Sequence, residues 1–347
     1  MVSEVEKRHK IIAAWLFVLV AMVLGMVVLG GVTRLTHSGL SMVEWRPVTG
    51  WLPPLGDAEW MAVFEKYQQS PEFQKINAHM GLAGFKSIFW LEFLHRLWGR
   101  VIGVVFAVPF AFFLLRRWID RPLVPKLILM FVLGGLQGLM GWYMVKSGLV
   151  DQPDVSQYRL TAHFGLALLI IGYMIWVALG LLFPGRHGPR ELSRFAVLIA
   201  CWAFLTAMSG GFVAGLDAGF AYNTFPLIDG AIVPDGLYAS SPWFHSAFED
   251  ILTVQFNHRV LAECLLVLVG IFWLKARYHV LEPRSRRAVN VLAGIVGAQA
   301  LLGITTLLLV VPVPLAAAHQ AGAVFVFMTA LWVAREMQSE KQARIDA

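Results

Sequence analysis

Residues 288–334 read AVNVLAGIVGAQALLGITTLLLVVPVPLAAAHQAGAVFVFMTALWVA and contain no Asp, Glu, Lys or Arg. A transmembrane helix needs about 20 mainly apolar residues, so this run is long enough for two of them. Pro312 and Pro314 stand near its middle, and proline cannot continue a helix. The segment therefore predicts two membrane spans joined by a tight turn.

Six further spans are predicted upstream. Four lie in runs without acidic or basic residues, at 11–33, 127–145, 160–185 and 195–216. Two more, 84–115 and 251–274, are apolar but contain charged residues. The composition agrees, with only 14% charged residues, against about 25% in soluble domains. We expect an all-α membrane protein with eight transmembrane helices.

Lys and Arg are concentrated at the N-terminus and in the segments 116–126, 186–194 and 275–287. Positive loops stay in the cytoplasm, which puts both termini there and the long loops 33–86 and 217–250 in the periplasm. The first span is too long for a signal-peptide core and is followed by no small-residue cleavage site. A multi-pass protein of a bacterial inner membrane is expected. The net charge of +6 lies mostly on the cytoplasmic side and predicts no nucleic-acid partner.

The two halves of the chain match each other. Gly30-Gly31 follows the first span as Gly210-Gly211 follows the fifth, and in each half a glutamine lies in the third span. The remaining matched pairs are Glu92-Phe-Leu-His95-Arg96 with Gln255-Phe-Asn-His258-Arg259, Gln137 with Gln299, and His163 with His319. An even number of spans per copy keeps both copies in one orientation. We expect two parallel four-helix-bundle repeats, 1–190 and 191–347, related by a pseudo-twofold axis along the membrane normal.

Each repeat places two histidines at the periplasmic ends of its second and fourth spans: His95 with His163, and His258 with His319. Ionisable groups within spans are costly and usually mark function. A neutral imidazole is also the usual axial ligand of haem iron. Two facing helices with a His at equal height predict a bis-His clamp for a flat macrocycle. The alternative is that each His donates an interfacial hydrogen bond to a neighbouring helix.

Arg96 and Arg259 directly follow the first histidine of each pair. At the periplasmic edge, a guanidinium is suited to bind a haem propionate. The alternative is that both side chains snorkel to the lipid headgroups.

Glu92 lies one helical turn before His95, and its counterpart Gln255 is a neutral isostere. A carboxylate in one copy only predicts that the first pocket does chemistry while the second transfers electrons or stabilises the fold. The alternative is an architectural ion pair between Glu92 and Arg96 or Lys86.

These residues resemble the haem A synthase family, which oxidises haem O to haem A for terminal oxidases. The likeness covers essentially the whole chain. It depends on the two His-Arg segments, on His163 and His319, and on the loop LTHSGLSMVEWRP at 35–47. The chain resembles the branch shared by alphaproteobacteria and mitochondria. Other members have a cysteine pair in the first loop, whereas Cys201 and Cys264 both lie in predicted spans.

The resemblance implies that His95 and His163 hold the substrate haem and that His258 and His319 hold a haem b. Glu92 is then the catalytic carboxylate. The implied reaction turns a ring methyl of haem O into a formyl group through a hydroxymethyl intermediate. It also implies contact with a haem O synthase (a farnesyltransferase), an electron donor, cytochrome oxidase assembly factors and membrane lipid. Glu92 serves either to stabilise a developing cation and take a proton from attacking water, or as a proton relay.

Two other functions remain open. One is a dihaem b-type electron carrier, which changes neither haem. The other is a transporter, since parallel repeats and polar groups within spans occur there too. The transporter is disfavoured because Gln137 and Gln299 are isolated and no polar path crosses the spans.

Overall fold

The structure is a computed structural model that describes residues 4–46, 49–148, 155–184 and 188–338. Within these ranges it consists of helices and loops, without a β-strand. Pro47 and Arg186, which belong to the 35–47 segment and to the fourth predicted loop, lie outside the described residues. The long helices are α1 Glu4–Leu35, α4 Leu82–Leu115, α5 Val124–Gly148, α6 Gln157–Leu182, α7 Arg190–Gly215, α9 Ile251–Arg277, α10 Pro283–Leu308 and α11 Val313–Glu336.

Seven of these helices are long and apolar enough to cross a membrane, counted over the described ranges. The predicted all-helical, multi-pass membrane protein is therefore confirmed. The sixth predicted span is a helix of 27 residues, α9, but it is not among the seven. The tight turn is present, because α10 ends at Leu308 and α11 begins at Val313 with Pro314 in its first turn.

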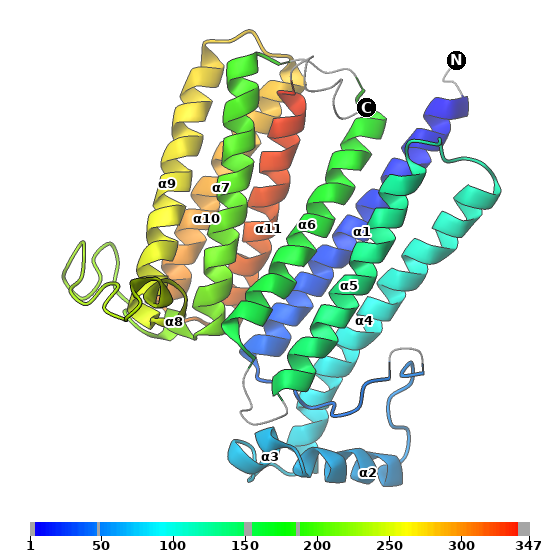
Figure 1. Ribbon diagram of the computed structural model, residues 1–347, viewed down its shortest axis with the longest axis vertical. Coiled ribbons are helices and arrows are strands. Elements are labelled where there is room, and N and C mark those ends of the chain that lie inside the picture. The colour runs from blue at the N-terminus through cyan, green and yellow to red at the C-terminus, as the bar shows by residue number, and fades with distance from the viewer. Residues whose placement is uncertain (1–3, 47–48, 149–154, 185–187, 339–347) are drawn as a thin grey trace.

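The long helices stand in two groups of four (Figure 1). In one, α1 packs against α4 and α6, and α5 packs against α6; in the other, α7 packs against α9 and α11, and α10 packs against α11. The groups meet where α6 contacts α7 and α11, and where α1 contacts α11. Small residues allow this approach: a Cβ on Gly172 of α6 would lie 3.0 Å from side-chain carbons of Phe327 and Leu331.

The long connections gather at one end of the bundle, opposite the start of α1 and the end of α11 (Figure 1). The first contains α2 Asp57–Gln68 and α3 Pro71–Lys75, and the second contains the short helices Ala218–Phe220, Trp243–His245 and α8 Ser246–Glu249. Aromatic side chains dock α2 onto the start of α4. They are Trp60, Phe64 and Tyr67 of α2 with Phe85, Phe89 and Phe93 of α4.

Glu72 of α3 gives this segment a pH dependence. Its side chain is buried, and its Oε2 has no hydrogen-bond partner among the described residues. Burial raises the pKa of Glu72 to about 7, which exceeds the lowering by the Tyr67 hydroxyl. Because the folded pKa lies above the unfolded one, the contribution to stability is complete below the unfolded pKa of about 4.3. It is lost as the pH rises through about 7.

We therefore expect amide hydrogen-exchange protection across residues 57–75 to be greater at pH 5 than at pH 8. Glu72→Gln removes the titrating group and should abolish that difference. Glu65→Gln changes an exposed carboxylate of α2 and should keep it. Equal protection of the wild-type segment at both pH values would contradict the expectation.

Candidate functional site

The four histidines lie in two pairs. His258 of α9 and His319 of α11 have ring centroids 6.5 Å apart and ring planes at 89°. His95 of α4 and His163 of α6 are neighbours in the other group of helices. All four rings are half-buried, and their helices start at the same end of the bundle (Figure 1). The structure thus brings together the same pairs that the repeat predicts.

The separation of His258 and His319 fits a haem iron between them. Two metal–imidazole bonds of about 2 Å, plus about 1 Å from each nitrogen to its ring centre, add up to about 6 Å. Over the described ranges, no group of three or more His, Cys, Asp or Glu side chains is placed to hold a metal ion. A haem needs only two protein ligands, because its macrocycle supplies the other four. The donor set therefore suits haem better than a bare metal.

Each histidine ring packs against a glycine of the neighbouring helix. A Cβ at the glycine would lie 2.7 to 3.3 Å from the ring Cε1, so a side chain there would displace the ring. The glycines that accommodate the imidazoles lie within α1, α5, α7 and α10, so the Gly-Gly pairs expected after the first and fifth spans belong to the ends of α1 and α7. The contacts are His95 with Gly30, His163 with Gly141, His258 with Gly210 and His319 with Gly303.

Two glutamines predicted to be isolated contact the histidines. Gln299 of α10 donates from Nε2 to the backbone oxygen of His319 at 2.8 Å and lies 3.0 Å from its Nδ1. Gln137 of α5 donates to the backbone oxygen of His163 at 3.0 Å, and its Nε2 lies 3.4 Å from the ring Nε2. The prediction of isolation was wrong, because sequence distance hides the packing of adjacent helices. Their shared position in the repeat was the available signal.

Glu92 is buried and hydrogen-bonded on both oxygens. Its Oε2 accepts from the Ser41 hydroxyl and from the backbone N–H of Met42, both at 2.7 Å, while Oε1 pairs with Arg96. Of the two partners considered from the sequence, Arg96 is the one in contact, whereas Lys86 lies over the ring of Trp60. Glu92 therefore attaches the first long loop to α4, a contact that the sequence did not reveal.

Gln255 occupies the matching position on α9 with the opposite hydrogen-bond polarity toward the loop. Its Nε2 donates to the backbone oxygens of Ala218 and Ala221 at 2.7 and 2.6 Å, and its Oε1 accepts from Arg259 at 2.6 Å. The first loop presents donors to a carboxylate, and the second presents acceptors to an amide. Glu92 and Gln255 are thus isosteric but are not interchangeable.

Both arginines also hold these loops. Arg96 donates to the backbone oxygens of Met42 and Glu44, each at 2.8 Å. Arg259 donates to those of Tyr222 and Thr224, also at 2.8 Å. Each arginine side chain therefore turns to its loop rather than extending freely toward the headgroups.

The first loop has a further tie to α2. The Lys66 ammonium pairs with the Glu44 carboxylate and holds the pKa of Glu44 below its usual range. Arg46 pairs with the same carboxylate. Residues 41–46 are consequently held by α2 on one side and by Glu92 and Arg96 of α4 on the other.

Comparison with known proteins shows the family to which this chain belongs. The chain matches the model of the COX15-CtaA family, cytochrome oxidase assembly protein, over residues 13–331. The chain belongs to this family. It is 54% identical over 337 residues to the haem A synthase of Nitrosospira multiformis, covering 96% of this chain and 95% of that protein. It is 52% identical to the haem A synthase of Paramagnetospirillum magneticum over 95% of this chain and 94% of that protein.

The similarity extends to mitochondrial relatives. The chain is 44% identical over 345 residues to haem A synthase COX15 of Bos taurus, covering 96% of this chain and 83% of that protein. The bacterial and mitochondrial resemblance noted from the sequence is thereby confirmed.

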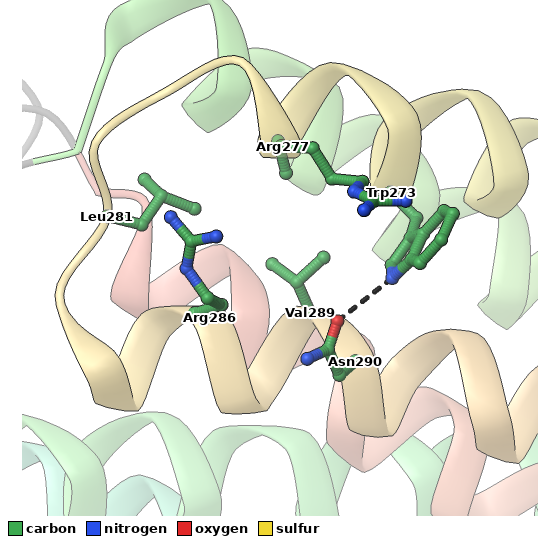
Figure 2. Close-up of a pocket in the computed structure, with 7 residues that line it drawn as sticks. Trp273, Arg277, Leu281, Arg286, Val289 and Asn290 are labelled. Carbon is green, nitrogen blue, oxygen red and sulfur yellow. Dashed lines mark hydrogen bonds between the residues drawn. The ribbon is translucent and has the colours of Figure 1, made fainter.

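A separate pocket lies where α9 ends and α10 begins (Figure 2). Trp273, Arg277, Arg286 and Asn290 line it, and the Trp273 indole donates to Asn290 Oδ1 at 2.9 Å. It contains none of the four paired histidines, which lie toward the starts of their helices. The pocket is thus distinct from the histidine site.

The opposite hydrogen-bond polarities of the two loops predict the effect of replacing Gln255 with the glutamate found at the matching position 92. Gln255→Glu would place a carboxylate against the carbonyl oxygens of Ala218 and Ala221, and a buried group that loses its hydrogen bonds costs about 1–3 kcal/mol, more when charged. We expect a lower thermal unfolding midpoint of the detergent-solubilised protein. Asn257→Asp is the control for added charge, because Asn257 Oδ1 already accepts from the Tyr238 hydroxyl and a carboxylate there keeps that hydrogen bond. If Gln255→Glu left the unfolding midpoint at the wild-type value, this result would contradict the hydrogen-bond pattern.

Proposed function

We propose that this protein is a haem A synthase, which oxidises a ring methyl of haem O to the formyl group of haem A through a hydroxymethyl intermediate. The observation that carries the proposal is near-full-length identity of 44–54% to bacterial and mitochondrial haem A synthases. The two histidine pairs give that similarity a chemical basis. Haem A is then supplied to a cytochrome oxidase, in keeping with the family's description.

His258 and His319 are proposed to hold a haem b, and His95 and His163 to hold the substrate haem. The perpendicular rings of His258 and His319, 6.5 Å apart, support the first assignment. The matching His–Gly contacts in both groups of helices support the second. When bound, the haem b supplies one-electron redox chemistry, while the protein positions it and tunes its potential.

Glu92 is proposed as the catalytic carboxylate of the first pocket. It lies one turn from His95, and Ser41, Met42 and Arg96 hold it in place. A fixed negative charge there stabilises positive charge developing on the substrate and can receive a proton.

Arg96 and Arg259 are proposed to contact the haem propionates in addition to their loops. The Nε of Arg259 is buried and has no partner among the described residues, so it has a hydrogen bond left to donate. Arg96 uses Nη1 for the Glu44 carbonyl and Nη2 for the Met42 carbonyl and Glu92, so two of the five guanidinium N–H groups are left for a propionate. The loops thereby become part of the propionate edge of each pocket.

The finer architecture is also proposed: eight spans including α9, in two parallel four-helix repeats, 1–190 and 191–347. The equivalent packing of α1 with α4 and α6 and of α7 with α9 and α11 supports it. So do the matched His–Gly contacts. The pseudo-twofold axis, which exchanges α6 with α11, then runs along the membrane normal between these two helices.

The proposed location is a bacterial inner membrane with both termini in the cytoplasm and the histidine pockets at the periplasmic side. Supporting this, α1 begins and α11 ends at the end opposite α2, α3 and α8 (Figure 1). The proposed partners are a haem O synthase, which must supply the substrate, an electron donor, and the assembly factors that receive haem A. Lipid surrounds the bundle.

The function is tested by pigment extraction from cells that make haem O but lack this enzyme. Expressing the protein should produce haem A. Glu92→Gln should lower the rate of haem A formation by a factor of about 10² to 10⁴. Haem O or the hydroxymethyl haem should accumulate instead. Expression without any haem A, with the haems spectroscopically intact, would favour the dihaem electron carrier over the synthase.

Loss of activity in Glu92→Gln must be separated from loss of the loop contact. Ser41→Ala removes one hydrogen bond to the same carboxylate while keeping its charge, so it should retain more haem A formation than Glu92→Gln. If Glu92→Gln made haem A at the normal rate, the carboxylate would be structural.

Orientation is tested with reporter fusions. A periplasm-active reporter inserted at Gly230, in the second long connection, should be active, and one at Val280, between α9 and α10, should be inactive. The difference arises because α9 lies between the two sites. Identical results at both sites would show that α9 does not span the membrane.

A further inference from the structure

The two pockets differ in what supports the first histidine of each pair. In the second pocket, the Ser209 hydroxyl of α7 lies 2.8 Å from His258 Nδ1. The same hydroxyl donates its proton to the backbone oxygen of Thr206 at 2.7 Å. A serine has a single hydroxyl proton, so its oxygen is left to accept a hydrogen bond from the ring. The proton of His258 is therefore on Nδ1, and Nε2 has a free lone pair.

The first pocket has no such support. Ser209 directly precedes Gly210-Gly211, and the residue that precedes Gly30-Gly31 is Leu29. The flanking contact is otherwise the same: Gly30 packs against His95 as Gly210 packs against His258. A leucine side chain has neither donor nor acceptor. The Nδ1 of His95 is accordingly buried without a hydrogen-bond partner among the described residues.

The contacts of the second histidines are of another kind, because the Gln299 amide nitrogen donates and cannot accept a hydrogen bond from a ring N–H. His319 Nδ1 lies 3.0 Å from Gln299, whereas His163 Nδ1 has no partner in the described part of the chain. Both Nδ1 atoms of the C-terminal pair thus have polar contacts, and both of the N-terminal pair lack them.

A hydrogen bond from the second ring nitrogen orients a metal-bound imidazole and raises its basicity. Resting on the haem assignment above, we propose that Ser209 is a positioning residue that makes His258 a permanent ligand of the resident haem. Leu29 leaves His95 a weaker ligand, so the first pocket can exchange substrate for product. A single position in the repeat thereby distinguishes a pocket that retains its haem from one that releases it.

The test uses purified full-length protein and measures two quantities for the resident haem: its midpoint potential and its rate of transfer to excess apomyoglobin. Ser209→Ala should raise the potential, because a less basic imidazole stabilises the ferric state less. It should also speed transfer by about 10- to 100-fold. Ser209→Thr keeps the hydroxyl and should restore both values.

Thr329→Val is the matched control. Thr329 is a buried residue of α11 whose hydroxyl bonds only the backbone oxygen of Phe325, so both readouts should stay at wild-type values. Leu29→Ser is the converse variant, and it should slow haem transfer from the first pocket. It also keeps the proposal testable if Ser209→Ala fails to fold.

The outcomes distinguish failure of the proposed roles of Ser209 and Leu29 from failure of the haem ligand assignment. Wild-type potential and transfer in Ser209→Ala would overturn the role of Ser209, as would a shift that Ser209→Thr does not reverse. Unchanged transfer from the first pocket in Leu29→Ser would overturn the role of Leu29. An unaltered low-spin haem spectrum in His258→Ala would instead overturn the ligand assignment, and the inference with it.

Discussion

An imidazole packed against a glycine backbone is the contact on which the bundle depends. It occurs four times, between α4 and α1, α6 and α5, α9 and α7, and α11 and α10. In a lipid environment the hydrophobic effect does not hold helices together, so close packing of small residues and internal hydrogen bonds must do so. Each glycine meets that requirement and makes room for a ring. Helix spacing and ligand position are therefore set by the same contact.

The loops at the histidine end follow from a second constraint. Buried backbone groups need partners, and an irregular loop against a helix bundle leaves many of them unpaired. Arg96 and Arg259 donate to two loop carbonyl oxygens each, while Glu92 accepts from the Met42 N–H and Gln255 donates to two further carbonyl oxygens. The choice of carboxylate or amide matches the polarity of its own loop. A residue with a proposed chemical role thus also completes the fold around it.

In the proposed two-repeat arrangement, the two halves share a scaffold, and a few residue differences give them different contacts. Glu92 against Gln255 places a carboxylate beside one histidine pair only. Ser209 against Leu29 supports a ring nitrogen in the other pocket only. Under the proposed assignment, the resident haem is held by oriented ligands, whereas the substrate haem must leave after reaction. The differences between the repeats are therefore as informative about function as their similarity.

The sequence alone determined the membrane class, seven of the predicted spans and the pairing of the histidines, because apolar runs and a repeat are properties of the linear chain. The sequence also predicted a span at 251–274; this segment forms the helix α9, which is not among the seven. Only the tertiary structure decided what Glu92, Gln137, Gln299 and Ser209 contact. Those partners lie on other helices or on a distant loop, and the direction of a hydrogen bond depends on which backbone atom faces the side chain. Residue type reveals a capacity to bond, but packing selects the partner.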